Sequence, residues 1–266
     1  MSNELLFEIG TEEIPAGFLS KAVVDMEEII RKSLTEKRID FNDIRCLATP
    51  RRLVLHIADL AAKQDDQTIE KLGPAKKAAF DENGQPTKAA LGFARGQGME
   101  VSQLETITTE KGEYLGARKT IPGQQTSDLL PGILKEFMLS IPFRKSMRWG
   151  SYDLRFARPV HWILAIYGGS VIPVKIEDIE SGNTSYGHRF MSPNPFTVKG
   201  FEDYLHKTRE NFVIADPGER KKLILEEARK AASEVGGELF YTDDLLETVS
   251  LIVEYPVNVR GGFDET

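Results

Sequence analysis

The residues best suited to contact a charged ligand lie between Phe143 and Trp162, in the stretch FRKSMRWGSYDLRFARPVHW, here called the Arg-aromatic segment. It holds five cations against one acid, Asp153, with aromatic side chains between them. Cations neutralise the phosphates of nucleic acids, while flat rings stack on unpaired bases. The candidate phosphate contacts are Arg144, Lys145, Arg148, Arg155 and Arg158, and the candidate stacking residues are Trp149 and Tyr152.

These cations are concentrated locally in an acidic chain of net charge −7. Residues 141–161 carry five bases and one acid, residues 44–57 carry three bases and no acid, and the remainder therefore carries −14. Two basic islands in an acidic protein favour a local, oriented contact with an anion. The alternative is that these arginines form salt bridges with the abundant Asp and Glu. Further cations that could extend the track are Arg51, Arg52, His188 and Arg189.

The residue patterns indicate no catalytic residue and no metal site. The four histidines show no HxxxH spacing, the single cysteine forms no CxxC, and GxSxG, GxxxxGK[ST] and GxGxxG are all missing from the sequence. Cys46 lies in an apolar stretch, which predicts a small core residue and not a nucleophile. Glu12 and Glu13 admit a general-acid or Mg²⁺ interpretation, but a solvated loop or a salt bridge to one of the arginines is favoured.

Strand and helix signals are mixed along the chain and do not follow a regular βαβ alternation. This pattern predicts an α+β fold, with mixed or antiparallel sheets and packed helices. At 266 residues the chain forms one large domain or two, with possible sub-domains 1–140 and 141–266. Pro50, in the turn between two predicted strands, predicts that Arg51 and Arg52 are exposed. Phe156, Trp162 and Phe190 each adjoin a strand-like apolar run and are expected in the core. The expected strands are 5–9, 44–47, 53–58, 104–109, 113–121, 163–167 and 171–176, and the expected helices are 18–38, 88–96, 126–141, 216–235 and 243–254.

The chain carries no apolar run long enough to span a bilayer, and acids stand near the N-terminus where a signal peptide needs bases. A single cysteine fits a reducing compartment. We therefore expect a cytoplasmic protein without a membrane partner.

Eight stretches in order resemble the N-terminal part of the β subunit of bacterial heterotetrameric glycyl-tRNA synthetase. They are LLFEIGTEEIP (5–15), ATPRRL (48–53), FARGQG (93–98), KGEYL (111–115), KSMRWG (145–150), RFARPVHW (155–162), SGNTSYGHRF (181–190) and VEYPV (253–257). Together they extend over nearly the whole chain. The HD-type helical domain and the anticodon-binding domain of the family are missing from it, so we expect an N-terminal fragment.

The resemblance implies a role in attaching glycine to its tRNA within an α2β2 assembly. In the family the α subunit carries the class II site for glycine, for ATP with Mg²⁺ and for adenylate formation. The β subunit is similar to a tRNA-binding platform. The expected partners are therefore the α subunit and the tRNA for glycine, without DNA, and the fragment alone is expected to be non-catalytic and to bind no cofactor.

Two other functions remain open. A scaffold that holds the α subunit without touching RNA would show a large exposed apolar patch. A hydrolase acting on mischarged tRNA would need a pocket at His161 or His188 with a carboxylate partner.

Overall fold

The computed structural model describes residues 3–262, which fall into two compact units. Unit 1 comprises the chain up to Lys63 and from Gln125 onward, and unit 2 comprises Gln64–Gln124. This division differs from the expected boundary at residues 140 and 141. Strands from both sides of that boundary pair in one sheet, so the boundary falls inside unit 1. The α+β class with mixed sheets and packed helices is confirmed.

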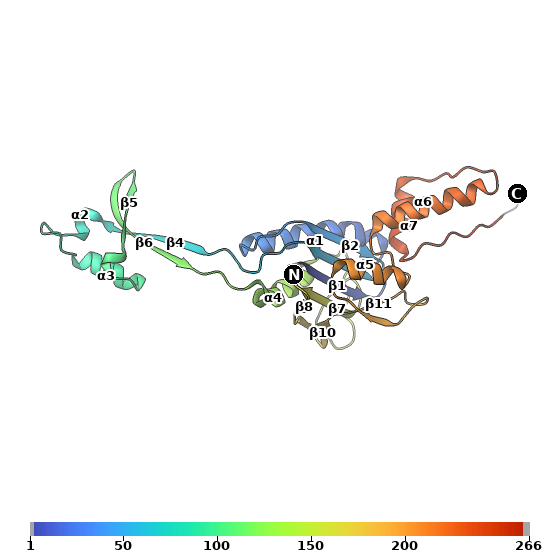
Figure 1. Ribbon diagram of the computed structural model, residues 1–266, viewed down its shortest axis with the longest axis horizontal. Helices are drawn as coiled ribbons and strands as arrows, with labels where there is room; N and C mark the ends of the chain where they lie inside the picture. Colours follow the sequence, from blue (N-terminus) through green and yellow to red (C-terminus); the bar gives the residue numbers. More distant parts are fainter. Residues whose placement is uncertain (1–2, 263–266) are drawn as a thin grey trace. The chain divides into compact units, whose positions relative to one another are not determined.

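Unit 1 is built on a seven-stranded sheet in the order β2-β3-β1-β7-β10-β9, with β8 paired to β7 (Figure 1). β10 runs parallel to β7, and the other pairings in the sheet are antiparallel. The central strand β1 has all seven residues buried, because the apolar run LLFEIGT has neighbours on both edges and both faces. The strand bounds are β1 Leu5–Thr11, β2 Ile44–Thr49, β3 Arg52–Ile57, β7 Val160–Tyr167, β8 Ser170–Val171, β9 Lys175–Ile176 and β10 Ile179–Gly182.

Helices cover both faces of this sheet. Alternate side chains of a strand point to opposite faces, so a strand that is apolar along its length needs a packing partner on each face. Phe7 belongs to the core under α1 (Ala16–Glu36) and α4 (Thr126–Ser140), where it packs edge-on against Phe137 with ring centroids 6.0 Å apart. Leu6 belongs to the core on the other face, which includes Phe201 and Tyr204 of α5 (Phe201–Glu210). Glu8 has the same parity as Leu6 and therefore faces the α5 side.

The C-terminal part of unit 1 adds a two-stranded sheet, β11 (Thr184–Tyr186) with β12 (Pro195–Thr197), and a helical hairpin, α6 (Pro217–Ser233) with α7 (Asp243–Ile252). Asp216 caps α6 by accepting the N–H groups of Gly218 and Glu219, as expected from the Asp-Pro start. The fully buried Arg220 donates to the carbonyls of Ala48 (2.7 Å) and Ser250 (2.8 Å). The hydrogen bonds of this α6 side chain connect α6 to α7 and to β2.

Unit 2 has a three-stranded antiparallel sheet in the order β4-β6-β5. Its small core gathers Ala79, Ala90 and Leu115. The expected hairpin β5–β6 is confirmed, and the expected helix at 88–96 is confirmed as α3. Its elements are β4 Gln67–Ala75, α2 Lys76–Ala79, α3 Lys88–Gln97, a 3-10 turn Val101–Gln103, β5 Glu105–Thr109 and β6 Gly112–Ile121.

Other sequence expectations meet mixed outcomes. The helices α1, α4, α6 and α7 are confirmed, within a few residues at their ends. The expected strand 171–176 is wrong, because β8 and β9 are separate two-residue strands and β9 pairs with β10. No element was expected at β4, α2, β10, β11, β12 or α5. Within residues 3–262, no helix combines the length and the apolar character needed to cross a bilayer.

Candidate anion-binding site at one end of the sheet

Three segments far apart in the sequence meet at one end of the unit 1 sheet. β1 ends at Thr11, and its antiparallel neighbours β3 and β7 both begin at that end. The N–H of Thr11 donates to the carbonyl of Arg51 (2.8 Å), and the N–H of Glu12 donates to the carbonyl of Pro159 (2.9 Å). The turn before β3 is thereby joined to Thr11, and the end of the Arg-aromatic segment is joined to Glu12.

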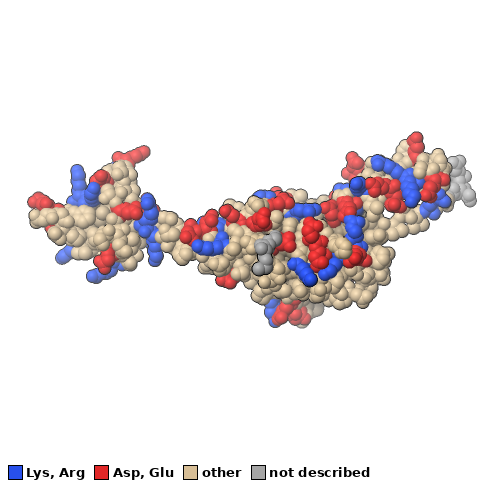
Figure 2. Space-filling view, in the orientation of Figure 1, with Lys and Arg blue, Asp and Glu red and all other residues tan. Residues whose placement is uncertain are grey.

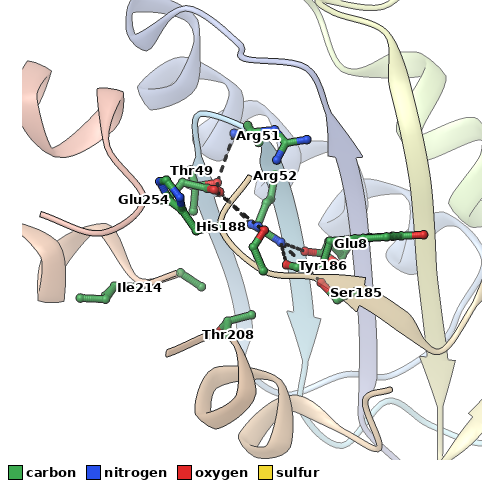
Figure 3. Close-up of polar contacts among 12 residues, drawn as sticks. Glu8, Thr49, Arg51, Arg52, Ser185, Tyr186, His188, Thr208, Ile214 and Glu254 are labelled. Atoms are coloured by element: carbon green, nitrogen blue, oxygen red, sulfur yellow. Dashed lines mark hydrogen bonds and ion pairs between the residues drawn. The ribbon is translucent and has the colours of Figure 1, made fainter. Parts of the chain in front are cut away.

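Arg52 lies at the centre of a buried polar network beside this end (Figure 3). Its Nε donates to Glu254 Oε1 (2.8 Å), and its Nη1 lies 3.3 Å from Glu8 Oε1. The carbonyls of Tyr186 (2.7 Å) and Gly187 (3.2 Å) accept its remaining donors. The expectation that Arg52 is exposed is therefore wrong, because carboxylates from β1 and from the segment after α7 enclose its side chain.

The charges of this network stabilise one another. Burial alone would lower the pKa of Arg52, but the carboxylates of Glu254 and Glu8 outweigh burial and raise that pKa. Burial alone would raise the pKa of Glu254, but the charge and hydrogen bond of Arg52, with a hydrogen bond from Thr49, lower it. Both groups are therefore held in their charged forms inside the protein.

Glu8 carries the network to the indole of Trp162. Its Oε2 accepts the Nε1–H of Trp162 (2.9 Å), and its Oε1 accepts the hydroxyl of Tyr204 (2.9 Å). The indole lies over Gly10, where an added Cβ would come within 1.9 Å of Trp162 Cε2. Trp162 and Phe156 are only 7% and 1% exposed, which confirms the expectation that both are core residues.

Outside this network lies an open pocket of about 340 Å³. Two arginines, a histidine and a tyrosine provide its charged or titratable lining, and no carboxylate lines it within the described part of the chain. Its volume is near the lower end of the range for small-molecule sites. The lining residues are Arg51, His161, Trp162, Tyr186, Gly187, Arg189 and Pro193.

Arg51 is half-buried, and its Nε is buried without a hydrogen-bond partner among residues 3–262. In Figure 3 its side chain points away from Glu254, and the dashed line at residue 51 joins the backbone N–H to Thr49 Oγ1. Burial lowers the pKa of Arg51, although the charge of Glu254 opposes this shift. A buried donor without an acceptor is destabilising by about 1–3 kcal/mol, so the guanidinium of Arg51 keeps an unused capacity to donate hydrogen bonds.

Arg189 is held at the other side of the pocket by Glu12 and Glu13. Its Nη1 lies 3.4 Å from Glu12 Oε2 and 3.2 Å from Glu13 Oε1. These contacts confirm the expected salt bridge between the Glu12-Glu13 pair and an arginine. Glu12 Oε1 also contacts His161 Nε2 (3.0 Å). Burial alone would raise the pKa of Glu12, but His161 and Arg189 lower it.

The loop after β11 carries the remaining candidates of this region. His188 Nδ1 accepts the N–H groups of Phe190 and Met191, both at 3.3 Å, and so shapes the turn. Phe190 is 79% exposed, so the expectation that it is a core residue is wrong. The residues after it form a turn and not a strand, and they bring no apolar surface over the ring. The guanidinium of Arg189 lies 5.2 Å from the centroid of the Phe190 ring.

The cations of the Arg-aromatic segment lie mainly on the surface of unit 1. Arg144, Lys145, Arg148 and Arg155 are exposed, and Arg158 is half-buried. Of these five, within the described residues, only Arg148 has a carboxylate within ion-pair distance, Asp153 at 3.5 Å. The salt-bridge alternative therefore applies to one cation of the five. On the face drawn in Figure 2, Lys and Arg side chains are interspersed with Asp and Glu.

Trp149 and Tyr152 anchor this segment. Both rings are half-buried, pack against the main core of unit 1 and contact each other edge-on, with centroids 6.2 Å apart. Their role in stacking on bases stays a prediction. Cys46 also packs against this core, and burial raises the pKa of its thiol to about 12, as fits a core residue.

Glu8 and Glu254 of the buried network and Tyr186 of the pocket were not among the residues expected from the sequence. Glu8 had a signal, because an acid inside the apolar run LLFEIG must find a buried partner. Its partner Arg52 is 44 residues away, and Arg52's second partner Glu254 is a further 202 residues along the chain, so spacing could not identify the set.

Comparison with known proteins gives one consistent result. The family model described as "Glycyl-tRNA synthetase beta subunit" matches residues 5–266. The glycine–tRNA ligase β subunit of Syntrophus aciditrophicus is 59% identical over 264 residues, that of Syntrophotalea carbinolica 50% over 266, and that of Geobacter sp. strain M21 49% over 263. These alignments cover 99%, 100% and 99% of this chain but 38%, 39% and 38% of the relatives. The chain therefore spans about two fifths of the length of the relatives it matches.

Proposed function

The chain belongs to the glycyl-tRNA synthetase β-subunit family, and from this premise we propose that it supplies part of the tRNA-binding surface of glycine–tRNA ligase. In this proposal the α subunit activates glycine with ATP and Mg²⁺, and the chain described here binds the tRNA for glycine and helps to assemble the α2β2 enzyme. It contributes no residue to the activation step.

The observation that supports RNA binding is the set of cations on the Arg-aromatic segment without carboxylate partners. An acidic protein has many acids available to pair with exposed arginines, yet Arg144, Lys145 and Arg155 have none within ion-pair distance among the described residues. Exposed guanidinium and ammonium groups are suited to phosphate oxygens. The acceptor end of a tRNA offers such phosphates along an A-form stem.

The chain of the Arg-aromatic segment continues into the lining of the pocket. Pro159, at the end of the loop, accepts the N–H of Glu12, and His161 follows two residues later in the pocket lining. We do not include Arg52 among the proposed RNA contacts, because its side chain is buried and hydrogen-bonded within the protein. We also do not include His188, because its Nδ1 accepts backbone N–H groups of the turn that follows it. The proposed RNA contacts are Arg51, Arg144, Lys145, Arg148, Arg155, Arg158 and Arg189.

The test is the binding of a glycine tRNA transcript across a salt series. The variant replaces Arg144, Lys145 and Arg155 by Gln, and the control replaces Lys222, Arg229 and Lys230 of α6 by Gln, so both lose three positive charges at exposed positions. Each lost phosphate contact lowers the slope of log affinity against log salt by about 0.9. We expect a slope about 2–3 units shallower in the first variant and an unchanged slope in the control. Equal slopes in all three proteins would overturn the proposal.

Assembly with the α subunit is supported by exposed apolar side chains around α6 and α7. Phe240, Val257 and Val259 are 86%, 67% and 92% exposed. Apolar side chains left this open are common where a protein partner binds. Replacing Phe240 and Val259 by Ser should weaken association with the α subunit and leave tRNA binding unchanged. If association is unaffected, this surface has no part in assembly.

Hydrolysis of mischarged tRNA is a second candidate, and one contact favours it. His161 lies in the pocket with Glu12 as its carboxylate partner, as such an activity requires. A hydrolase would release amino acid from mischarged glycine tRNA at a rate that falls at least tenfold in His161→Ala. A rate equal to that of the tRNA alone would remove this candidate.

A further inference from the structure

We propose that the pocket between Arg51 and Arg189 binds one unpaired nucleotide of RNA, with its phosphate at the two guanidinium groups and its base beside Phe190 and Tyr186. This inference rests on the proposed function, and it adds a pocket that selects single-stranded RNA to a surface that contacts phosphates.

The phosphate position follows from Arg51. Its guanidinium lines the pocket, its Nε is buried without a partner in the described chain, and no carboxylate among those residues lies within ion-pair distance of it. A phosphate oxygen supplies a charged acceptor, and guanidinium groups bind phosphate through parallel hydrogen bonds. Arg51 is therefore the main anchor of the phosphate.

Arg189 is the second cation at this position, and two acids already hold it. Its contacts with Glu12 and Glu13 fix the guanidinium at the pocket and neutralise part of the local charge. A pocket with such nearby carboxylates has a limited capacity for negative charge. It therefore suits a single phosphodiester better than a triphosphate or another polyanion.

The base position follows from the rings around the arginines. Trp162 is buried and forms the floor, and Tyr186 packs on it with centroids 4.9 Å apart. Phe190 lines the smaller cavity that shares Arg51 and Arg189 with the pocket; it is 79% exposed, and the face of its ring that Arg189 does not cover is available to a base. Stacking on an aromatic ring and an arginine is the usual way in which proteins bind single-stranded nucleic acid.

The size of the pocket favours an unpaired nucleotide. A volume of about 340 Å³ is in the range of small-molecule sites. A base inside a duplex is stacked and paired, and it cannot enter such a pocket without leaving the helix. A smaller cavity of about 150 Å³ shares Arg51 and Arg189 with the pocket, and its lining includes Phe190 and the carboxylates of Glu13 and Glu254. These carboxylates leave room at the two arginines for one phosphate and disfavour a second phosphate in the smaller cavity.

The experiment compares a single-stranded RNA tetranucleotide with a short RNA duplex as ligands of this chain, by fluorescence anisotropy at low salt. The variants are Arg51→Gln and Phe190→Ala, and the control is Arg229→Gln, an exposed arginine of α6. Because Phe190 is exposed, its truncation does not threaten folding, and the thermal midpoint of Arg51→Gln is measured alongside.

We expect Arg51→Gln to lose at least tenfold and Phe190→Ala about fivefold in affinity for the tetranucleotide. The control should change less than twofold, and duplex binding should change little in Phe190→Ala. A nucleoside 5′-monophosphate should compete with the tetranucleotide, and the nucleoside without phosphate should not.

Three results would overturn the inference. One is tetranucleotide binding that neither variant weakens. If the triple variant of Arg144, Lys145 and Arg155 still loses tRNA binding in that case, the proposed function stands and only the assignment of the pocket fails. Another is a wild-type chain that binds neither tetranucleotide nor monophosphate. The last is an Arg51→Gln chain that keeps its RNA affinity but loses the α subunit, which would make the pocket a site for an acidic protein segment.

Discussion

Arg51 and Arg52 are neighbours in the chain with opposite surroundings. The guanidinium of Arg52 is fully buried and donates to Glu254, Glu8 and two carbonyls, while the Nε of Arg51 has no acceptor among the described residues. The first arginine therefore has a structural role. The second keeps its binding capacity for a ligand.

Replacing Arg52 by Met should destabilise the protein by about 3–5 kcal/mol, because Glu8 and Glu254 would stay buried without their counter-charge. Arg51→Met is the matched control, and it should leave the free energy of unfolding unchanged or raise it by up to about 1–3 kcal/mol, since the buried Nε that it removes has no hydrogen-bond acceptor. Urea unfolding of both variants measures the difference. Equal losses in the two variants would contradict this division of roles.

The ion pair of Glu254 also predicts a pH dependence of stability. The pKa of Glu254 in the folded protein is lowered from its ordinary value of 4.5. Its stabilising contribution is therefore fully present above that ordinary value and is lost as the pH falls through the lowered one. Glu254→Gln should be less stable than wild type at pH 7, and the two should converge at acidic pH. A constant difference across the pH range would contradict the assigned shift.

For single residues, the sequence predicted the region of the site but not which of its side chains are buried and which are free to bind a ligand. The concentration of arginines in residues 143–162 and at 51–52 was visible from composition. Which arginine is buried was not, because burial of Arg52 depends on Glu254, 202 residues away. The exposure of Phe190 likewise depends on a turn that His188 holds and that no apolar periodicity signals.

Among the elements, β1 depends on a glycine at its end. A Cβ at residue 10 would lie 1.9 Å from the Trp162 ring, so Gly10→Ala must displace the indole and its hydrogen bond to Glu8. We expect a loss of about 1–3 kcal/mol and a change in tryptophan fluorescence. Gly17→Ala in α1, where a Cβ meets nothing within 4 Å, should instead stabilise the protein by about 0.5–1 kcal/mol. Similar stabilities of the two variants would show that the indole can move without cost.

The elements that the sequence revealed are those with their own periodic apolar face. α4 and α1 bury residues at helical spacing, and β1 and β3 are apolar along their length. β4 was missed because most of its side chains are exposed and its pairing with β6 is made by the backbone. α5 was missed because its charged sequence buries only Phe201, Tyr204 and Thr208.

In the whole molecule, unit 2 is an insertion between two paired residues of unit 1. Lys63 and Gln125 form an antiparallel bridge, and the N–H of Thr126 donates to the carbonyl of Ala62 (2.9 Å). An Asn-Gly turn can close such a pair after residues 64–124 are removed. We expect the shortened protein to unfold cooperatively, with a midpoint within about 4 °C of the unit 1 transition in the full chain. A shortened protein without a cooperative transition would show that unit 1 needs unit 2 to fold.

The bond between Arg52 and Glu254 also has a consequence during translation. The two residues are 202 positions apart, so at about 5–20 residues per second the ribosome needs roughly 10–40 s between them. During that interval the nascent pair of strands β1 and β3 carries Glu8 and Arg52 without Glu254, while the synthesis of unit 2, whose contacts are local, is completed. Protease sensitivity of stalled nascent chains would follow this order, with unit 2 protected first. The centre of the larger unit thus stays open until almost all of this chain has left the ribosome.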